Sequence, residues 1–336
     1  MRFQPAVIRA LAIAAGLFLL VWQPNAAWIE RAYANGAYPV WEHVAVALDA
    51  IAPWSLGDVA VLAGVVLVAW RLRRRDWLGA LAILGCYAAW FQVSWGWNYD
   101  RAPIEARVRY DATRVNSAAI ERLRAHAIAE MNRLAPLAHA RERFDLTTLA
   151  DAWRPVVRAG GDAWTPSVTG PKPTLADPFM AATGTSGYIN PLTLNVHLAS
   201  DLLWFERPFS LAHEWSHDAA YAREDEANYL AILACTRSRD PVLQYSGWLE
   251  LFLYLPALPH YARSTFVPLV WSDFDALRAR NASRVNARLA RLSWHTYNAY
   301  LKSKRIPNGV ENYDEVTRLY LGIPRDADGL PQPLAP

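Results

Sequence analysis

The chain is poor in cysteine, in lysine and in net charge, and each scarcity excludes a class of protein. Only Cys86 and Cys235 occur among 336 residues, too few for a disulfide framework or a four-cysteine zinc site. Lysine is confined to Lys172, Lys302 and Lys304, an arginine bias that by itself points to no function. A net charge of +3, with no basic block outside the apolar N-terminal third, argues against a nucleic-acid partner.

The chain contains long apolar segments, and they are confined to its N-terminal third. They run near residues 6–23, 56–71 and 77–97. The third carries no charge and reaches the roughly 20 residues that cross a bilayer, whereas the first two are shorter and need flanking residues or a locally thinner bilayer. We therefore expect about three transmembrane helices within residues 1–100 and a separate domain in residues 101–336. This organisation argues against a plain cytosolic enzyme.

The placement of arginine orients these segments. The turn between the second and third segments holds four arginines, Arg71, Arg73, Arg74 and Arg75. The positive-inside rule places such a turn in the cytoplasm. Arg2 and Arg9 place the N-terminus on the same side, and the loop 23–55 holds only Arg31. With three crossings of the plasma (inner) membrane, everything after about Asn98 lies outside the cytoplasm, on the periplasmic side.

The first apolar segment has a second interpretation, as a cleaved signal peptide. Asn25-Ala26-Ala27 resembles the small-residue site at which such peptides are cut. Cleavage would change the number of membrane anchors. It would leave the large domain on the same side of the membrane.

After Arg101 the sequence pattern predicts a mainly helical domain with one small extended element. We expect helices over residues 208–235, 241–255 and 273–303. The run 186–198 predicts a short hairpin or an edge strand. Residues 247–258 are apolar enough for a fourth crossing, but Glu250 and Pro256 favour a packed or interfacial helix.

The motif His213-Glu-Trp-Ser-His217 carries the chemistry of this sequence. Its two histidines stand at i and i+4 and share one helical face, so both imidazoles can reach a single metal ion. Glu214, directly after the first histidine, is placed to take a proton from a water held by that metal. Zinc fits best, because it accepts imidazole and carboxylate ligands and keeps one open position in catalytic sites. The alternative is a pair of core histidines that hold no metal.

The third ligand is open among several acidic residues downstream. Glu224 is the first choice because it stands four residues before Asn228, which could hydrogen-bond a ligand histidine from the same side of the following helix. Glu226 is the rival, and Asp218 and Asp225 are more distant alternatives. The first helix must stop near Asp218 and the chain must turn sharply, with no glycine to ease the turn. The order of residues reproduces that of two-His-one-Glu zinc peptidases, with Asn in place of Asp.

Several stretches beyond the motif match those of one known family. The matching residues are 54–58, 96–101, 187–193, 208–209, 213–217, 223–228, 300–302, 309–310 and 313. With them the sequence resembles the bacterial membrane proteins grouped as domain of unknown function 3810, which are regarded as zinc-metallopeptidase-like. The chain departs from the family at Asp218 and Ala220, where Gln and Gly are expected, and near Leu194, where an acidic residue is expected. The resemblance implies a helical, zincin-like (gluzincin-type) metallopeptidase domain and leaves the substrate open.

If zinc is bound, the motif predicts hydrolysis of a peptide or protein substrate. Glu214 would take the water proton and pass it to the leaving amine. Residues 187–196 could bind an extended peptide by strand addition, with an ordinary surface hairpin as an equal alternative. The donor to the developing oxyanion is not identified by the sequence, and the candidate phenols and imidazole are Tyr188, His295, Tyr297 and Tyr313.

Two classes of function fit this sequence. The first is a membrane-anchored zinc peptidase, and the second is a catalytically silent membrane protein whose metal site holds the domain together or binds a partner. Glu214 separates them, because a structural site needs no general base. The lipid bilayer is a partner in both classes, no nucleic acid is expected in either, and the oligomeric state stays open. A transporter is disfavoured because the apolar segments carry ionisable residues only near their ends, at Arg9 and Asp58.

Overall fold

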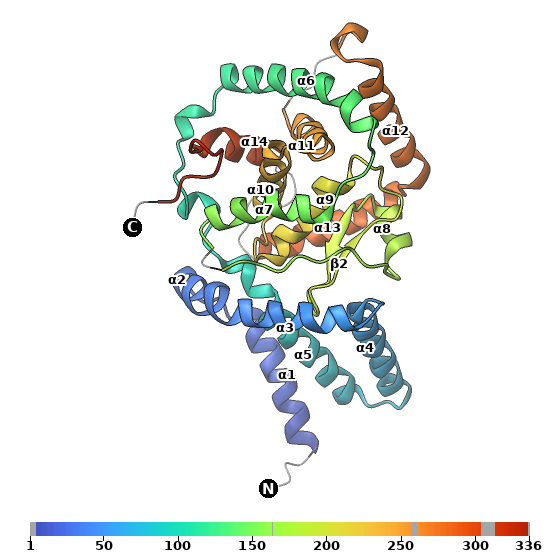
Figure 1. Ribbon diagram of the computed structural model, residues 1–336. Helices are drawn as coiled ribbons and strands as arrows, with labels where there is room; N and C mark the ends of the chain where they lie inside the picture. Colours follow the sequence, from blue (N-terminus) through green and yellow to red (C-terminus); the bar gives the residue numbers. More distant parts are fainter. Residues whose placement is uncertain (1–4, 163, 257–260, 304–312, 335–336) are drawn as a thin grey trace. The chain divides into compact units, whose positions relative to one another are not determined.

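The computed structural model in Figure 1 describes residues 5–162, 164–256, 261–303 and 313–334, and the chain divides into two units. The first unit comprises Met1–Arg101, Lys172–Leu175 and Ile189–Asn195. The second comprises Ala102–Pro171, Ala176–Tyr188 and Val196–Pro336. Both units are built mainly from helices, as the sequence predicted.

Helices form nearly all of the first unit. The apolar segments form α1 (Pro5–Val21), α4 (Leu56–Arg73) and α5 (Trp77–Ser94). A 3-10 helix (Gly96–Asp100) follows α5. The connection over residues 23–55 is itself mostly helical, which the sequence pattern did not indicate. This stretch forms α2 (Ala26–Trp28), the π-helix η1 (Ile29–Ala37) and α3 (Tyr38–Ile51). The side chains of Asn25 and Ser55 cap α2 and α4, since they accept hydrogen bonds from the backbone N–H groups of Trp28 and Asp58.

Glycine contacts set the packing of α1 against α5. A Cβ atom added at Gly16 would lie 2.5 Å from the carbonyl oxygen of Gly85, so the two backbones touch at this point. Such close approach through small residues is typical of helices that pack by van der Waals contact in lipid. Near the start of α5, Asp76 accepts hydrogen bonds from Arg9 (3.0 Å) and from Arg71 (2.9 Å). Arg9, the charged residue near the start of α1, is therefore paired with Asp76.

The outer surface of these helices suggests an association with a membrane. Among the described residues, α5 is the one helix that alone is long and apolar enough to span a bilayer, and only 28% of its span is buried. α1 passes the same test together with Ala26–Ile51, from which it is bent by 106°. Large apolar side chains such as Leu17, Val65 and Leu84 are exposed along α1, α4 and α5. A helix in the core of a soluble protein would have most of these side chains buried.

Buried polar contacts tie two short segments from later in the chain to the first unit. Lys172 Nζ lies 2.6 Å from Asp49 Oδ1, and Asn195 also donates a hydrogen bond to this carboxylate. The Nε1 atom of Trp90 donates to the carbonyl of Leu192 at 2.9 Å. The buried charge of Asp49 thus has a cation and a further donor as partners, as a charge removed from water requires.

The second unit is a helical bundle around a central helix that is almost entirely buried. Its elements are α6 (Ser117–His139), α7 (Leu146–Ala159), α8 (Asp177–Thr183), α9 (Arg207–Asp218), α10 (Glu224–Arg237), α11 (Pro241–Leu253), α12 (Pro268–Arg284), α13 (Ala287–Ser303) and α14 (Tyr313–Gly322). α10 packs against α7, α9, α11 and α14, and nearly all of its residues are buried. A helix surrounded in this way carries apolar residues on every side, which explains the uniformly apolar run after the motif.

Three expectations for this unit can be compared with the structure. The predicted hairpin is present as β1 (Gly187–Ile189) and β2 (Val196–Leu198), which pair with each other. Within the stretch 247–258, residues 247–253 form the end of the largely buried helix α11, as Glu250 suggested, and residues 257–258 lie outside the described residues. The single helix expected over 273–303 is instead two, α12 and α13. Asn286 accepts hydrogen bonds from the N–H groups of Arg288 and Leu289 and thereby starts the second helix.

Candidate metal centre

Helix α9 presents the motif from a rigid position in the core. The two residues between Glu214 and His217 face the protein interior. Trp215 donates its indole N–H to the carbonyl of Thr169 at 2.9 Å, and Ser216 accepts a hydrogen bond from the indole of Trp153 at 2.9 Å. These contacts fix the rotation of α9 about its axis.

Three candidate ligand atoms converge where α9 meets the start of α10. Glu224 Oε2 lies 3.3 Å from His213 Nε2 and 3.7 Å from His217 Nε2. All three ligand atoms lie within 4.8 Å of one another. Ligands about 2.1 Å from a tetrahedral zinc ion are about 3.4 Å apart, and the two distances from Glu224 to the histidines are close to this value.

The connection between α9 and α10 makes this convergence possible without glycine. α9 ends at Asp218, and Ala220 adopts a left-handed conformation with φ of 69°. The N–H of Ala220 donates to the carbonyl of His217 at 2.8 Å, and the N–H of Tyr221 donates to that of Ser216 at 3.1 Å. These bonds satisfy carbonyls at the end of α9. An alanine thus accepts the strain of a position that favours glycine, at a cost of about 1 kcal/mol.

The charges around the three atoms suit a metal cation. Burial opposes ionisation of Glu224, but the nearby imidazoles outweigh it and hold the pKa of this carboxyl well below its ordinary value. Burial also disfavours the charged form of His217, yet the Glu224 carboxylate raises the pKa of this imidazole to about 9. The cluster therefore combines an ionised carboxylate with a neighbouring imidazole, His217, whose charged form this carboxylate favours. A cation would compensate the carboxylate in place of the proton on His217.

The carboxylate of Glu214 lies next to the three candidate ligands but does not belong to their cluster. Its side chain is 3% exposed, and its Oε2 atom has no hydrogen-bond partner among the described residues. Burial raises the pKa of this carboxyl to about 7, with smaller opposing effects of His213 and His217. Strand β1 passes directly beside it, since a Cβ atom added at Gly187 would lie 2.6 Å from Glu214 Oε1. The sequence did not indicate this role of Gly187, because glycine in a short strand is also common at bulges and tight bends.

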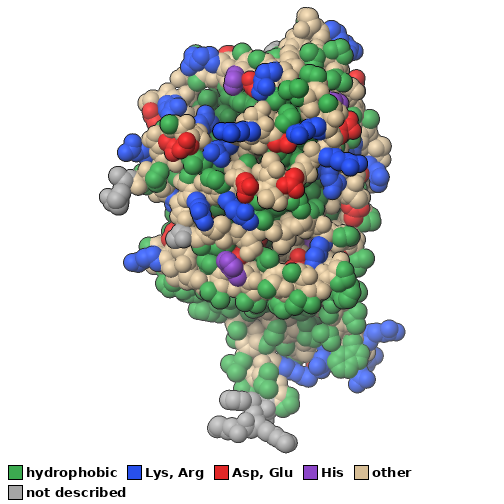
Figure 2. Space-filling view, viewed as in Figure 1, with side chains coloured by type: hydrophobic (Ala, Val, Ile, Leu, Met, Phe, Trp, Pro, Cys, Tyr) green, Lys and Arg blue, Asp and Glu red, His purple; other side chains and the backbone are tan. Residues whose placement is uncertain are grey.

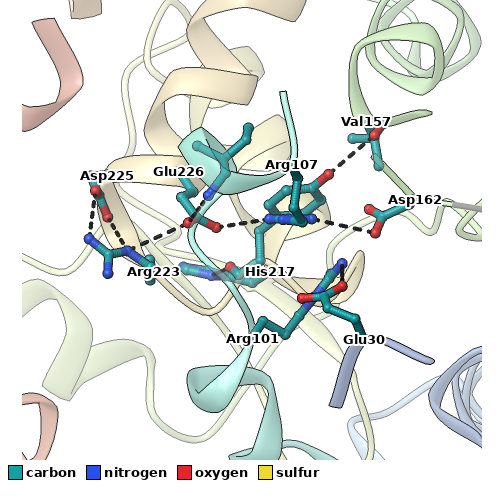
Figure 3. Close-up of polar contacts among 11 residues, drawn as sticks. Glu30, Arg101, Arg107, Val157, Asp162, His217, Arg223, Asp225 and Glu226 are labelled. Atoms are coloured by element: carbon teal, nitrogen blue, oxygen red, sulfur yellow. Dashed lines mark hydrogen bonds and ion pairs between the residues drawn. The ribbon is translucent and has the colours of Figure 1, made fainter. Parts of the chain in front are cut away.

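Glu226, the rival ligand, is committed elsewhere (Figure 3). Its Oε1 accepts the N–H of Ile104 at 2.9 Å, and its Oε2 lies 3.3 Å from Arg107 Nη2. Arg223 approaches the same carboxylate at 3.5 Å and also pairs with Asp225. Neither Glu226 nor Asp225 belongs to the cluster of ligand atoms found among the described residues, and Asp218 does not either.

Arg107 stabilises the turn beside the candidate metal centre through buried contacts. It lies between the carboxylates of Glu226 and Asp162, and its guanidinium stacks 4.6 Å from the centre of the Tyr221 ring. The carbonyl of Tyr221 in turn lies 2.7 Å from His217 Nδ1 and orients this imidazole. Sequence reasoning missed both residues, because nothing local links position 107 to the motif.

The role expected of Asn228 is filled by the Tyr221 carbonyl. That carbonyl holds His217 Nδ1, while Nε2 of the same ring faces Glu224, so neither nitrogen is left for Asn228. The Nδ1 atom of His213 has no hydrogen-bond partner among the described residues. The predicted hydrogen bond from Asn228 to a ligand histidine is therefore not formed. The reason is that a backbone carbonyl in the turn, that of Tyr221, already occupies His217 Nδ1.

One of the candidate oxyanion donors lies beside the cluster. Tyr297, on α13, donates its hydroxyl to Glu224 Oε1 at 2.7 Å. Tyr188 is half-buried and packs its ring 4.7 Å from that of His197, and His295 is exposed on α13. Tyr313 begins α14, but its side chain lies outside the described residues.

Comparison with known proteins identifies the family of the chain but assigns no activity to it. A family model described as "Protein of unknown function (DUF3810)" matches residues 33–321. No curated protein matches the chain, and no solved structure matches it.

Proposed function

Because the chain belongs to the DUF3810 family, whose description assigns no activity, we propose from its own residues that it is a membrane-anchored zinc peptidase. The observation that carries this proposal is that three side chains form a cluster of candidate metal ligands and a fourth, buried carboxylate lies next to it. His213, His217 and Glu224 bring their ligand atoms together, while Glu214 stands beside them, buried and outside the cluster. A purely structural zinc site has no use for an additional buried carboxylate at this place.

The residues of the chain divide the proposed reaction between them. His213, His217 and Glu224 would hold zinc, which when bound supplies Lewis-acid polarisation of a water molecule and of the scissile carbonyl. Glu214 takes the proton of the attacking water on its partnerless Oε2 and passes it to the leaving amine. Tyr297 orients Glu224 through its hydrogen bond to Oε1, which leaves Oε2 directed towards the two imidazoles.

We further propose that the first unit crosses the plasma (inner) membrane several times and that the peptidase unit lies on the periplasmic side. The cluster of arginines at the end of α4 and in the turn before α5 supports this orientation. Arg9 pairs with Asp76 at this same turn, so the start of α1 and the turn belong on one side of the membrane. With three crossings, Asn98 and the chain after it belong on the other side.

Metal content of the detergent-purified protein tests the ligand set. We expect about one zinc ion per wild-type chain and loss of that ion in Glu224→Gln. Glu226→Gln is the matched control: the same substitution two residues away, where the carboxylate faces Arg107, should leave the zinc in place. Circular dichroism of both variants establishes that each is folded. Retention of zinc in Glu224→Gln with loss in Glu226→Gln would exchange the roles assigned to the two residues.

Hydrolysis tests the proposed reaction separately. A peptide mixture incubated with the zinc-loaded protein and followed by mass spectrometry should yield cleavage products. Glu214→Gln should retain zinc and thermal stability but lose at least about 10²-fold in rate, since it removes the general base. Zinc binding without cleavage in the wild type would instead favour a silent protein whose metal site holds the domain together or binds a partner.

A further inference from the structure

Helix α3 exposes a continuous apolar stripe. Val40, Val44, Leu48 and Ile51 recur at spacings of four, four and three residues, which places them on one face of the helix. Their exposed fractions are 66%, 47%, 48% and 81%, and Trp54, just after the helix, is 59% exposed. No charged residue lies within this stripe. A soluble surface helix has the reverse arrangement, with its apolar face turned inward.

The opposite face of α3 is the one held by the protein. Tyr38, Glu42, Ala45 and Asp49 are buried there. Asp49 pairs with Lys172, so the rotation of α3 about its axis is fixed by a buried ion pair. The apolar stripe therefore faces outward as a consequence of specific contacts on the other side of the helix.

The stripe is continuous with the apolar surface of the membrane-associated helices. α1 is bent by 106° from Ala26–Ile51, and Figure 1 shows α1, α4 and α5 extending away from α3 to the same side. Figure 2 shows a band of hydrophobic side chains along the stretch where Figure 1 draws α3, with more hydrophobic surface on the helices beyond it. An in-plane helix lies at such a junction when the neighbouring helices enter the membrane.

Exposed tryptophans mark the same level of the unit. Trp22 and Trp28, at the bend between α1 and α3, have ring centres 5.6 Å apart, and Trp22 also contacts Trp97 at 5.4 Å. Trp54 lies at the other end of α3. Indole rings concentrate where acyl chains meet headgroups, because they combine an apolar ring with a polar N–H group.

We propose that α3 lies in the plane of the membrane, with its apolar stripe buried at the boundary between lipid headgroups and acyl chains. The occupant of this face is lipid, because the stripe continues the surface that α1, α4 and α5 offer to the bilayer. The inference rests on the membrane anchoring proposed above and is independent of the peptidase activity. α3 thus adds a second mode of attachment, parallel to the membrane surface.

Nitroxide labels at single cysteines test this placement in the full-length protein. The background is Cys86→Ala, which removes the exposed thiol, while Cys235 is buried. Labels at Val44 and Ile51 report on the stripe, a label at Leu84 on α5 reports on the membrane interior, and one at the exposed Arg122 on α6 reports on water. The protein is reconstituted in phosphatidylcholine–phosphatidylglycerol vesicles. Collision of each label with oxygen, which concentrates in lipid, is compared with collision with a water-soluble nickel chelate.

The expected result is preferential collision with oxygen at Val44 and Ile51, at a shallower depth than at Leu84, and preferential collision with nickel at Arg122. The proposal is overturned if both stripe labels behave like Arg122 while Leu84 lies in lipid. It also fails if both are shielded from oxygen and nickel, which means that protein covers them, or if they lie as deep as Leu84. A water-exposed Leu84 would refute the membrane anchoring itself. Because the labelled side chains are exposed, the labels should not disturb packing.

Discussion

Replacement of Gly187 by alanine should disturb the candidate base without touching any candidate ligand. The new Cβ atom would lie 2.6 Å from Glu214 Oε1 and 2.9 Å from Glu214 Cγ, whereas ordinary contacts begin at 3.4 Å. It would also lie 2.9 Å from the carbonyl oxygen of His197 on the paired strand, which is backbone and cannot swing away. Either Glu214 or the hairpin must therefore move by about 0.8 Å, the shortfall in the closest contact.

The magnitude of the effect follows from this overlap. Overpacking of a well-packed site costs typically about 1–3 kcal/mol, and about 2 kcal/mol lowers the melting temperature of a unit of this size by roughly 4–8 °C. A displacement near 1 Å at a catalytic group can reduce a rate by about 10²-fold. We therefore expect Gly187→Ala to melt several degrees lower and to lose most hydrolysis, while its zinc content stays at about one ion per chain.

The matched control is Gly170→Ala in the same unit. A Cβ atom there would meet only Leu146 Cδ1, at the ordinary distance of 3.5 Å, so this substitution should change neither melting temperature nor rate by a measurable amount. Melting is followed by circular dichroism, zinc by atomic emission and cleavage by mass spectrometry. The reasoning is refuted if Gly187→Ala equals the control in stability and activity. Loss of zinc in Gly187→Ala would show that the displacement extends beyond Glu214 to the ligands.

Three further predictions test other parts of the molecule. Tyr297→Phe removes the donor to Glu224 Oε1 and should weaken zinc binding about 10-fold in a competition with a chelator; unchanged affinity would leave the phenol without this role. Burial raises the pKa of Glu250 to about 8 from an ordinary 4.5, so the folded state favours the neutral acid and loses stability as pH rises through this interval. The melting temperature of Glu250→Gln should therefore exceed that of the wild type at pH 8 and match it near pH 4.5, whereas a constant difference would contradict this ionisation. Gly16→Val places side-chain atoms against the backbone of Gly85 and should lower the melting temperature of the detergent-purified protein; an unchanged value would argue against close packing of α1 on α5.

Features with a local cause could be predicted from the sequence. α4 and α5 follow from apolar runs that begin at capping residues, and the face shared by His213 and His217 follows from helical periodicity alone. α3 was not predicted because its buried and exposed faces are the reverse of those of an ordinary surface helix. Its polar residues Glu42 and Asp49 face the protein and its apolar residues face outward, so the usual rule for a surface helix gives no signal.

Features that depend on the direction of one helix relative to another could not be settled in advance. Glu224 and Glu226 are only two residues apart, and which one faces the histidines depends on how Ala220 turns the chain between α9 and α10. The partner that draws Glu226 away, Arg107, lies 119 positions earlier in the sequence. The prediction for Asn228 failed for a related reason, since the turn itself supplies a backbone carbonyl to His217.

The contact between Gly16 and Gly85 has a consequence for the order in which the chain is made. α1 is synthesised first, yet its packing partner in the first unit is α5, not the intervening α4. At about 5–20 residues per second, Gly85 is added roughly 3–14 s after Gly16. For most of that interval α1 has neither its helix partner nor Asp76, the counter-ion of Arg9. Completion of α5 therefore completes the packing of α1, and a chain that ends before Asp76 lacks the counter-ion of Arg9.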